Sequence, residues 1–200
     1  KSMSQTRGKF IVIYASNNLG KTDQLDRLEA TWKELGRPYT RLKYAIYHTP
    51  TGIIINRELR GKPEERVLSD LELQTLQAEN KREYEPCLLE LLKDGEVFAE
   101  DYLGTGIAWG LTKGVQRSYL YGINADLLVP DISILLDGQR FSSGIEAGHR
   151  HEAAGEGTWE RNREIHRQLA TEFGWEVVEN VPVFPEKTHE EIMRIIVGRW

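Results

Sequence analysis

Residues 15–22 carry the residue types best suited to binding phosphate groups. They match the Walker A phosphate-loop pattern with alanine at its first glycine position, and they are Ala15, Ser16, Asn17, Asn18, Leu19, Gly20, Lys21 and Thr22. In such a loop, backbone N–H groups and the start of the next helix point at an anion. The Lys21 ammonium can reach the β- and γ-phosphates of a nucleotide, and the Thr22 hydroxyl can bind Mg²⁺. The alternative is an ordinary helix start that contains Gly-Lys-Thr.

Acidic residues at the end of a predicted strand are the second chemical signal. Glu100 and Asp101 directly follow the apolar residues 97–99. Ligands of open α/β sheets bind beyond the carboxyl ends of the strands. One of the two carboxylates could therefore hold Mg²⁺, directly or through water, or orient an acceptor. The alternative is a solvated turn in which one acid caps a helix.

A glycine-rich segment with basic residues is the third signal. Residues 138–157 contain five glycines, two histidines and two arginines, which predicts a mobile lid at about residues 138–158. Arginine side chains suit the charge of a transferring phosphoryl group, and the residues that occupy or flank the lid are Arg140, Arg150, Arg161 and Arg163. For any one of them, a role as solvated surface charge is the simpler interpretation, but for the set of four it is not. His149, His151 and Glu152 only loosely resemble a metal cluster, so a lid or surface role is favoured for them.

The elements around these signals alternate between strands and helices, which predicts an α/β fold with a central parallel sheet. Predicted strands cover residues 10–14, 39–47, 96–99, 131–137 and 175–178. Predicted helices cover residues 21–35, 53–59 and 189–197. A long helix is expected to begin at a Ser69–Glu72 capping box, and apolar residues recur at helical spacing over residues 159–173. Glycine-rich residues 104–110 are expected to lead into another helix. The length of 200 residues predicts a single domain.

Composition limits the classes of function. The net charge of −5 argues against a broad nucleic-acid surface but permits a local basic pocket. Cys87 is the single cysteine, so no intramolecular disulfide and no cysteine zinc cluster are expected. No apolar run is long enough to span a membrane, and no apolar signal region is present at the start. We therefore expect a cytoplasmic protein that binds neither nucleic acid nor membrane.

Together these motifs resemble the thymidylate kinase family of P-loop nucleoside monophosphate kinases, from residue 10 to about residue 197. The resemblance also includes an Ala-Asp-Arg-like stretch at residues 78–82, Glu100-Asp101-Tyr102 followed by Ala108-Trp109-Gly110, Pro130-Asp131 to Leu136-Asp137, and the lid. It implies a three-layer P-loop NTPase fold and transfer of the ATP γ-phosphate to dTMP, which gives dTDP. It also implies Mg²⁺ with ATP as phosphate donor, and a homodimer.

The resemblance also implies roles for particular residues. Those implied in catalysis are Lys21, Arg150, Glu100 and Asp101, and those implied in holding Mg²⁺ are Thr22, Glu100 and Asp101. The residues expected to bind the acceptor nucleotide are Lys43, Tyr44, Tyr47, Arg60, Lys81, Arg82, Tyr102 and Trp109. The aromatic ones suit stacking on a flat base, and the alternative for them is a place in the apolar core. The register leaves both Lys81 and Arg82 open as the basic residue of the central helix.

The chain departs from the family pattern beside Tyr102, where the family has an arginine that helps bind the acceptor phosphate. No arginine stands there, and Lys43 replaces another arginine. Residues elsewhere must then supply the positive charge, the candidates being Arg57, Arg60, Lys81 and Arg82. Three alternatives follow: a deoxynucleoside kinase with Glu100 as base, a kinase for another deoxynucleotide, and a nucleotide-binding protein without turnover.

Overall fold

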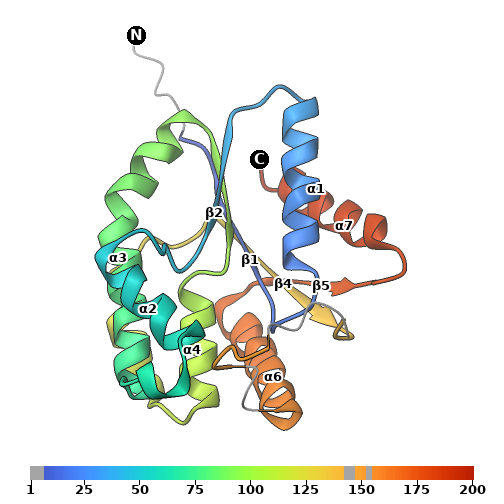
Figure 1. Cartoon of the computed structure of the whole chain (residues 1–200). Helices are drawn as coiled ribbons and strands as arrows, with labels where there is room; N and C mark the ends of the chain where they lie inside the picture. The colour runs from blue at the N-terminus through green and yellow to red at the C-terminus, as the bar shows by residue number, and fades with distance from the viewer. Residues whose placement is uncertain (1–6, 142–146, 152–154) are drawn as a thin grey trace.

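The centre of the fold is a parallel sheet with the strand order β2-β3-β1-β4-β5 (Figure 1). The computed structural model describes residues 7–141, 147–151 and 155–200. The strands are β1 (Phe10–Tyr14), β2 (Tyr39–Lys43), β3 (Glu96–Glu100), β4 (Ile132–Gly138) and β5 (Glu176–Asn180). The helices are α1 (Lys21–Glu34), α2 (Pro50–Arg60), a 3₁₀ turn (Pro63–Glu65), α3 (Asp70–Asp94), α4 (Leu103–Thr112), α5 (Arg117–Asn124), α6 (Glu156–Phe173) and α7 (Pro185–Val197). The predicted lid lies partly outside the described residues.

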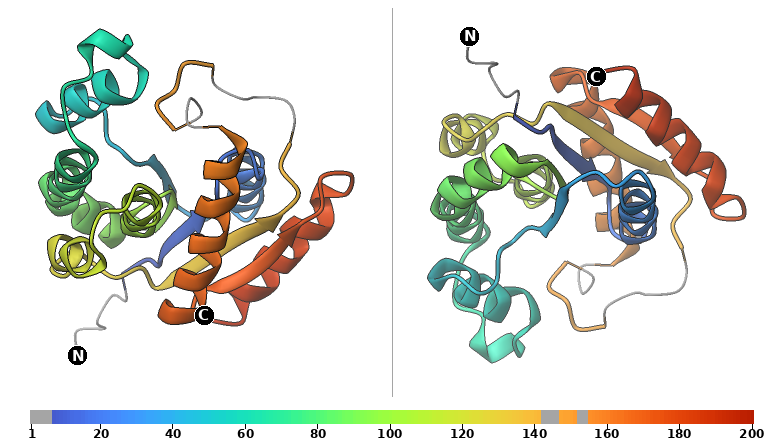
Figure 2. Two further views of the ribbon diagram at one scale, coloured as in Figure 1. Left: turned by 90° about the horizontal axis from the view of Figure 1, so that it is seen from below. Right: turned by 90° about the horizontal axis from the view of Figure 1, so that it is seen from above.

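Both faces of the sheet are covered, because successive side chains of a strand point to opposite faces. On β1, Ile11 and Ile13 join the apolar cluster that contains Leu25 and Leu28 of α1. Phe10, Val12 and Tyr14 join the cluster on the other face, which includes side chains of α3. Helices α1 and α7 pack in the first cluster and α3 packs in the second, and Figure 2 shows α3 and α4 grouped together at one side of the molecule. The predicted three-layer P-loop fold is confirmed.

The glycine-rich stretch after β3 differs from its prediction, because it is itself helix α4. A Cβ atom at Gly104 would lie 2.4 Å from the Trp175 ring, and one at Gly110 would lie 2.5 Å from Leu120. Glycine here permits close helix packing, whereas its low helix propensity predicts a loop. A helix does follow residue 110, namely α5, and β2 ends at Lys43 rather than at residue 47.

The phosphate loop is anchored to α6 by a buried polar network. The Ser16 hydroxyl donates to the side-chain oxygen of Asn162 at 2.9 Å, and the Asn162 amide donates to the Thr112 hydroxyl at 3.1 Å. The Trp159 indole donates to the backbone oxygen of Asn17 at 2.8 Å. Asn162 is fully buried. The loop is therefore held by contacts far away in the sequence, which limits the conformations open to its backbone.

Replacing Asn162 with alanine should destabilise the protein. The change removes two hydrogen bonds and leaves the buried Ser16 and Thr112 hydroxyls with fewer partners, at a cost of about 2 kcal/mol in the free energy of unfolding. Urea unfolding of Asn162→Ala measures this cost. Gln168→Ala, at an exposed position of the same helix, is the control and should stay within about 0.5 kcal/mol of wild type. Equal stability of the two variants would contradict the prediction.

None of the helices in the described part of the chain combines the length and the apolar character that a membrane span requires.

Candidate functional site

A cavity of about 460 Å³ runs along the carboxyl edge of the sheet, at the lower side of Figure 1. It connects the phosphate loop at one end with the facing surfaces of α3 and α4 at the other. Its lining includes Asn17, Asn18, Leu19, Gly20, Lys21, Thr22, Lys43, Tyr44, Tyr47, Arg60, Gln74, Gln77, Lys81, Glu100, Asp101, Tyr102, Thr105, Trp109, His149 and His151. One continuous space therefore joins the predicted donor residues to most of the predicted acceptor residues.

The predicted phosphate loop ends in a left-handed glycine directly before α1. Gly20 adopts φ 84°, in the left-handed region that favours glycine, immediately before α1 begins at Lys21. The Lys21 ammonium donates to the Asp101 carboxylate at 2.6 Å and lies 3.4 Å from the backbone oxygen of Ala15. Asp101 also accepts a 2.9 Å hydrogen bond from Thr105. A bound phosphate would compete with Asp101 for the lysine.

Thr22 and Glu100 provide adjacent oxygen atoms that suit Mg²⁺. The Thr22 hydroxyl lies 3.2 Å from one Glu100 carboxylate oxygen, and Glu100 is only 4% exposed. Neighbouring oxygen ligands in octahedral Mg²⁺ coordination are about 3 Å apart, because each lies about 2.1 Å from the ion. The ammonium of Lys43 lies 3.3 Å from the same carboxylate. The oxygen atoms of Thr22 and Glu100 suit the Mg²⁺ ion that the sequence predicts. Asp101, the third predicted ligand, is the next residue in the chain.

Lys81 places a buried ammonium at the acceptor end of the cavity. Lys81 is 2% exposed, donates to the backbone oxygen of Gln77 at 2.9 Å, and lies 5.9 Å from the centre of the Tyr44 ring. Burial lowers the pKa of Lys81 to about 8. Arg82 instead contacts Asp126 at 2.6 Å and does not line the cavity. Of the two basic residues left open by the sequence, Lys81 is therefore the one beside the cavity.

The aromatic residues expected around the acceptor lie in the same region. The Tyr44 and Tyr102 rings are 5.0 Å apart, and the Arg60 guanidinium lies 5.0 Å from the Tyr47 ring. Fully buried Asn80 holds the connection between β2 and α2. Its side chain accepts a 2.8 Å hydrogen bond from the backbone N–H of Ile46 and donates to the Ile46 oxygen at 3.0 Å. The polar residue that interrupts the apolar face of α3 thus positions one wall of the cavity.

The structure adds residues that sequence reasoning did not assign to the cavity. The His151 ring stacks on Trp109 with centroids 3.8 Å apart and planes 4° apart. Gln74 and Gln77 reach the cavity from α3, and Gln74 is 4% exposed with a carbonyl oxygen that has no partner among the described residues. Two glutamines three residues apart on a helix are common in sequences, so they gave no signal of a binding site. The stacking of His151 depends on tertiary contacts alone.

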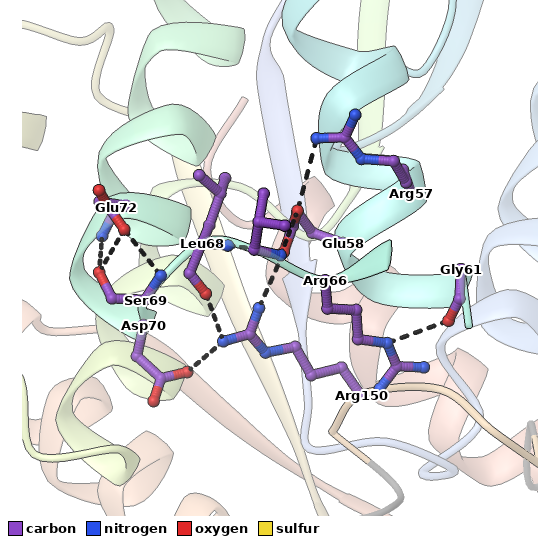
Figure 3. Close-up of polar contacts among 10 residues, drawn as sticks. Arg57, Glu58, Gly61, Arg66, Leu68, Ser69, Asp70, Glu72 and Arg150 are labelled. Atoms are coloured by element: carbon purple, nitrogen blue, oxygen red, sulfur yellow. Dashed lines mark hydrogen bonds and ion pairs between the residues drawn. The ribbon is translucent and has the colours of Figure 1, made fainter. Parts of the chain in front are cut away.

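Three of the four arginines in or beside the predicted lid, Arg140, Arg150 and Arg163, contact acidic groups or an aromatic ring. Arg150 does not line the cavity, and its guanidinium lies 3.3 Å from Glu58 and 3.1 Å from Asp70 (Figure 3). Arg163 pairs with Asp137 at 2.6 Å, and Arg140 lies over the Trp159 ring. A catalytic role for Arg150 therefore stays a prediction that would require it to leave these partners.

The histidines of the lid show no metal site within the described chain. No cluster of three or more His, Cys, Asp or Glu side chains suited to a metal ion occurs in residues 7–141, 147–151 and 155–200. His149 and His151 have ring centroids 5.3 Å apart. Glu152, the third member of the weak pattern in the sequence, lies outside the described residues.

The lowered pKa of Lys81 predicts a specific dependence of stability on pH. Between pH 8 and 10.5 the unfolded chain holds more protons at this position than the folded chain, so the free energy of unfolding rises with pH. Relative to Lys81→Met, wild type should gain up to about 1.4 kcal/mol per pH unit. Urea unfolding from pH 7.5 to pH 10 measures this difference, with the exposed Lys33→Met as control. A constant difference between wild type and Lys81→Met would contradict it.

The known proteins that are similar to this chain are thymidylate kinases, although no protein-family profile matches the chain. Over 152 residues it is 28% identical to the thymidylate kinase of Dictyostelium discoideum. That match covers 75% of this chain and 65% of the relative, which is less than two thirds of the relative's length. It is 25% identical over 206 residues to the thymidylate kinase of Synechococcus sp. (strain WH7803), with 96% of each chain covered.

A solved structure extends the similarity to the fold. The thymidylate kinase of Candida albicans matches with a TM-score of 0.81 at 19% identity, and the match covers 96% of this chain and 92% of that one. Sequence relatives that span nearly the whole chain carry the same family name as this structural neighbour. The chain is therefore similar in sequence and in fold to thymidylate kinases, at 23–28% identity to the sequence relatives.

Proposed function

We propose that this protein transfers the γ-phosphate of ATP to dTMP and forms dTDP. The observation that carries the proposal is the continuous cavity between the phosphate loop and the acceptor end, where a lysine and aromatic rings meet. Both substrates must share one space, because in-line transfer needs the acceptor oxygen and the γ-phosphorus within reach of each other. The names of the relatives supply the identity of the acceptor.

At the donor end, backbone N–H groups of the loop and the Lys21 ammonium hold the ATP phosphates. Lys21 exchanges its 2.6 Å contact with Asp101 for the phosphate oxygens. Thr22 and Glu100 hold Mg²⁺, which neutralises charge on the phosphates. The adjacent hydroxyl and carboxylate oxygens support this assignment.

At the acceptor end, positive charge has to come from lysine and arginine residues that stand outside the usual family motif. Lys43, Arg60 and Lys81 all line the cavity, and Lys81 is buried there. The pyrimidine ring packs against aromatic side chains such as Trp109, since flat faces suit a flat base. The acceptor phosphate is already ionised, so its attack needs no strong general base. A homodimer in the cytoplasm belongs to the same proposal.

An acceptor panel tests the function and separates it from the alternatives. Purified protein with ATP and Mg²⁺ is offered dTMP, dUMP, dCMP, dGMP, dAMP or thymidine, and the phosphorylated products are quantified. We expect dTDP from dTMP as the main product. Product from thymidine but not from dTMP would replace the proposal with a nucleoside kinase. Nucleotide binding without any product would indicate a protein without turnover.

Removing the loop ammonium should abolish transfer. We expect Lys21→Met to lower kcat/KM about a thousandfold, because the positive charge acts on the transferring phosphoryl group. Lys33→Met removes an exposed ammonium from the end of the same helix and should leave the rate unchanged. Wild-type activity of Lys21→Met would exclude the phosphate-loop assignment.

Changing the proposed Mg²⁺ ligand should alter the metal requirement. Glu100→Gln retains the size of the side chain but removes its charge, so the Mg²⁺ concentration at half-maximal rate should rise about tenfold. Titration of the rate against Mg²⁺ at fixed ATP measures the change. An unaltered titration curve would show that Glu100 does not hold the ion.

A further inference from the structure

Glu58 is a fully buried acidic residue in α2, so its carboxylate needs hydrogen-bond donors and a cation nearby. One of its oxygens accepts from the backbone N–H of Val67 at 3.1 Å, and the other accepts from that of Leu68 at 3.2 Å. A buried negative charge is costly unless it is also paired with a cation. The Arg150 guanidinium, 3.3 Å away, supplies one, and Arg57 lies 3.6 Å away (Figure 3).

Arg150 is bound to this region through both its main chain and its side chain. Its backbone N–H donates to the Leu59 oxygen at 2.9 Å. Its guanidinium donates to the Leu68 oxygen and to the Asp70 carboxylate, each at 3.1 Å, besides contacting Glu58 (Figure 3). The guanidinium therefore joins the end of α2 to the start of α3.

A neighbouring contact holds the same short segment. Arg66, in the connection between α2 and α3, donates to the backbone oxygen of Gly148 at 2.6 Å. Residues 148–150 are thus held by backbone and side-chain hydrogen bonds, and by ion pairs, to elements that flank the acceptor end of the cavity. This arrangement fixes where the next residue, His151, can lie.

His151 forms part of the cavity wall because residues 148–150 are held in place by these contacts. Its ring stacks on Trp109 of α4, and both rings line the cavity. Burial lowers the pKa of His151 well below its ordinary value, and nearby His149 adds to this effect. The imidazole is therefore neutral at pH 7 and presents a flat, uncharged surface. Such a surface suits a nucleobase better than an imidazolium would.

We infer that Arg150 is a positioning residue that latches residues 147–151 to Glu58 and so completes the acceptor-binding wall formed by His151 and Trp109. The inference rests on the proposed function for the identity of the acceptor. It assigns Arg150 to acceptor binding rather than to the γ-phosphate. A latch would affect dTMP binding even without ATP, whereas a contact with the γ-phosphate would need bound ATP.

Binding of dTMP without ATP separates the two roles. Isothermal titration should show a Kd for dTMP that rises about tenfold in Arg150→Met and in Glu58→Gln, with partial rescue in Arg150→Lys. In steady-state assays the KM for dTMP should rise, while the KM for ATP and kcat at saturating dTMP stay near wild type. Arg194→Met, at an exposed position of α7, is the control. An unchanged dTMP affinity with a hundredfold loss of kcat in Arg150→Met would overturn the inference.

A second measurement does not depend on the acceptor. Hydrogen–deuterium exchange of the ligand-free protein should be faster over residues 147–151 in both Arg150→Met and Glu58→Gln. The double variant should show less than the sum of the two single changes, because the two residues share the Arg150–Glu58 contact. Unaltered exchange in both single variants would overturn the latch. Faster exchange together with no dTMP binding by the wild-type protein would uphold the latch and reject dTMP as the acceptor.

Discussion

The parallel pairing of β1 with β3 is the constraint on which the cavity depends. Ile13 is in register with Glu100, and the backbone N–H of Asp101 donates to the Ile13 oxygen at 3.2 Å. This register brings the residues that follow the two strands together at one edge, although about 80 positions separate them in the sequence. Lys21 meets Asp101 and Thr22 meets Glu100 for this reason. A shift of one residue would turn the side chains of β3 to the opposite face.

Charge compensation is the second constraint, and it explains why several ionisable groups at the cavity are paired or buried. Asp101 pairs with Lys21 at 2.6 Å and compensates its charge. Lys81 contributes an ammonium from inside the fold, where burial lowers its pKa. Glu58 is paired with Arg150 by the same physics, because a buried charge needs a partner of opposite sign.

Local patterns were sufficient for some predictions and misleading for others. The Ser69–Glu72 capping box is formed as expected, because its hydrogen bonds join residues three apart. Glycine-rich residues 104–110 were expected to lead into a helix and instead form α4 themselves, where the glycines allow close packing against Trp175 and Leu120. Arg82 could not be distinguished from Lys81 in the sequence. The rotation of α3 against the sheet decides which of the two residues faces the cavity.

The sequence by itself determined the α/β fold class, the turn from β1 into α1 at residues 15–22 and the acidic residues that follow β3, because each depends on contiguous residues and on periodicity. Only the tertiary structure decided that His151 stacks on Trp109, that Arg150 pairs with Glu58, and that Asn162 supports the loop at Ser16. These contacts join residues 42 to 146 positions apart. Their formation depends on how helices pack on the sheet, and no local preference of the chain encodes that packing.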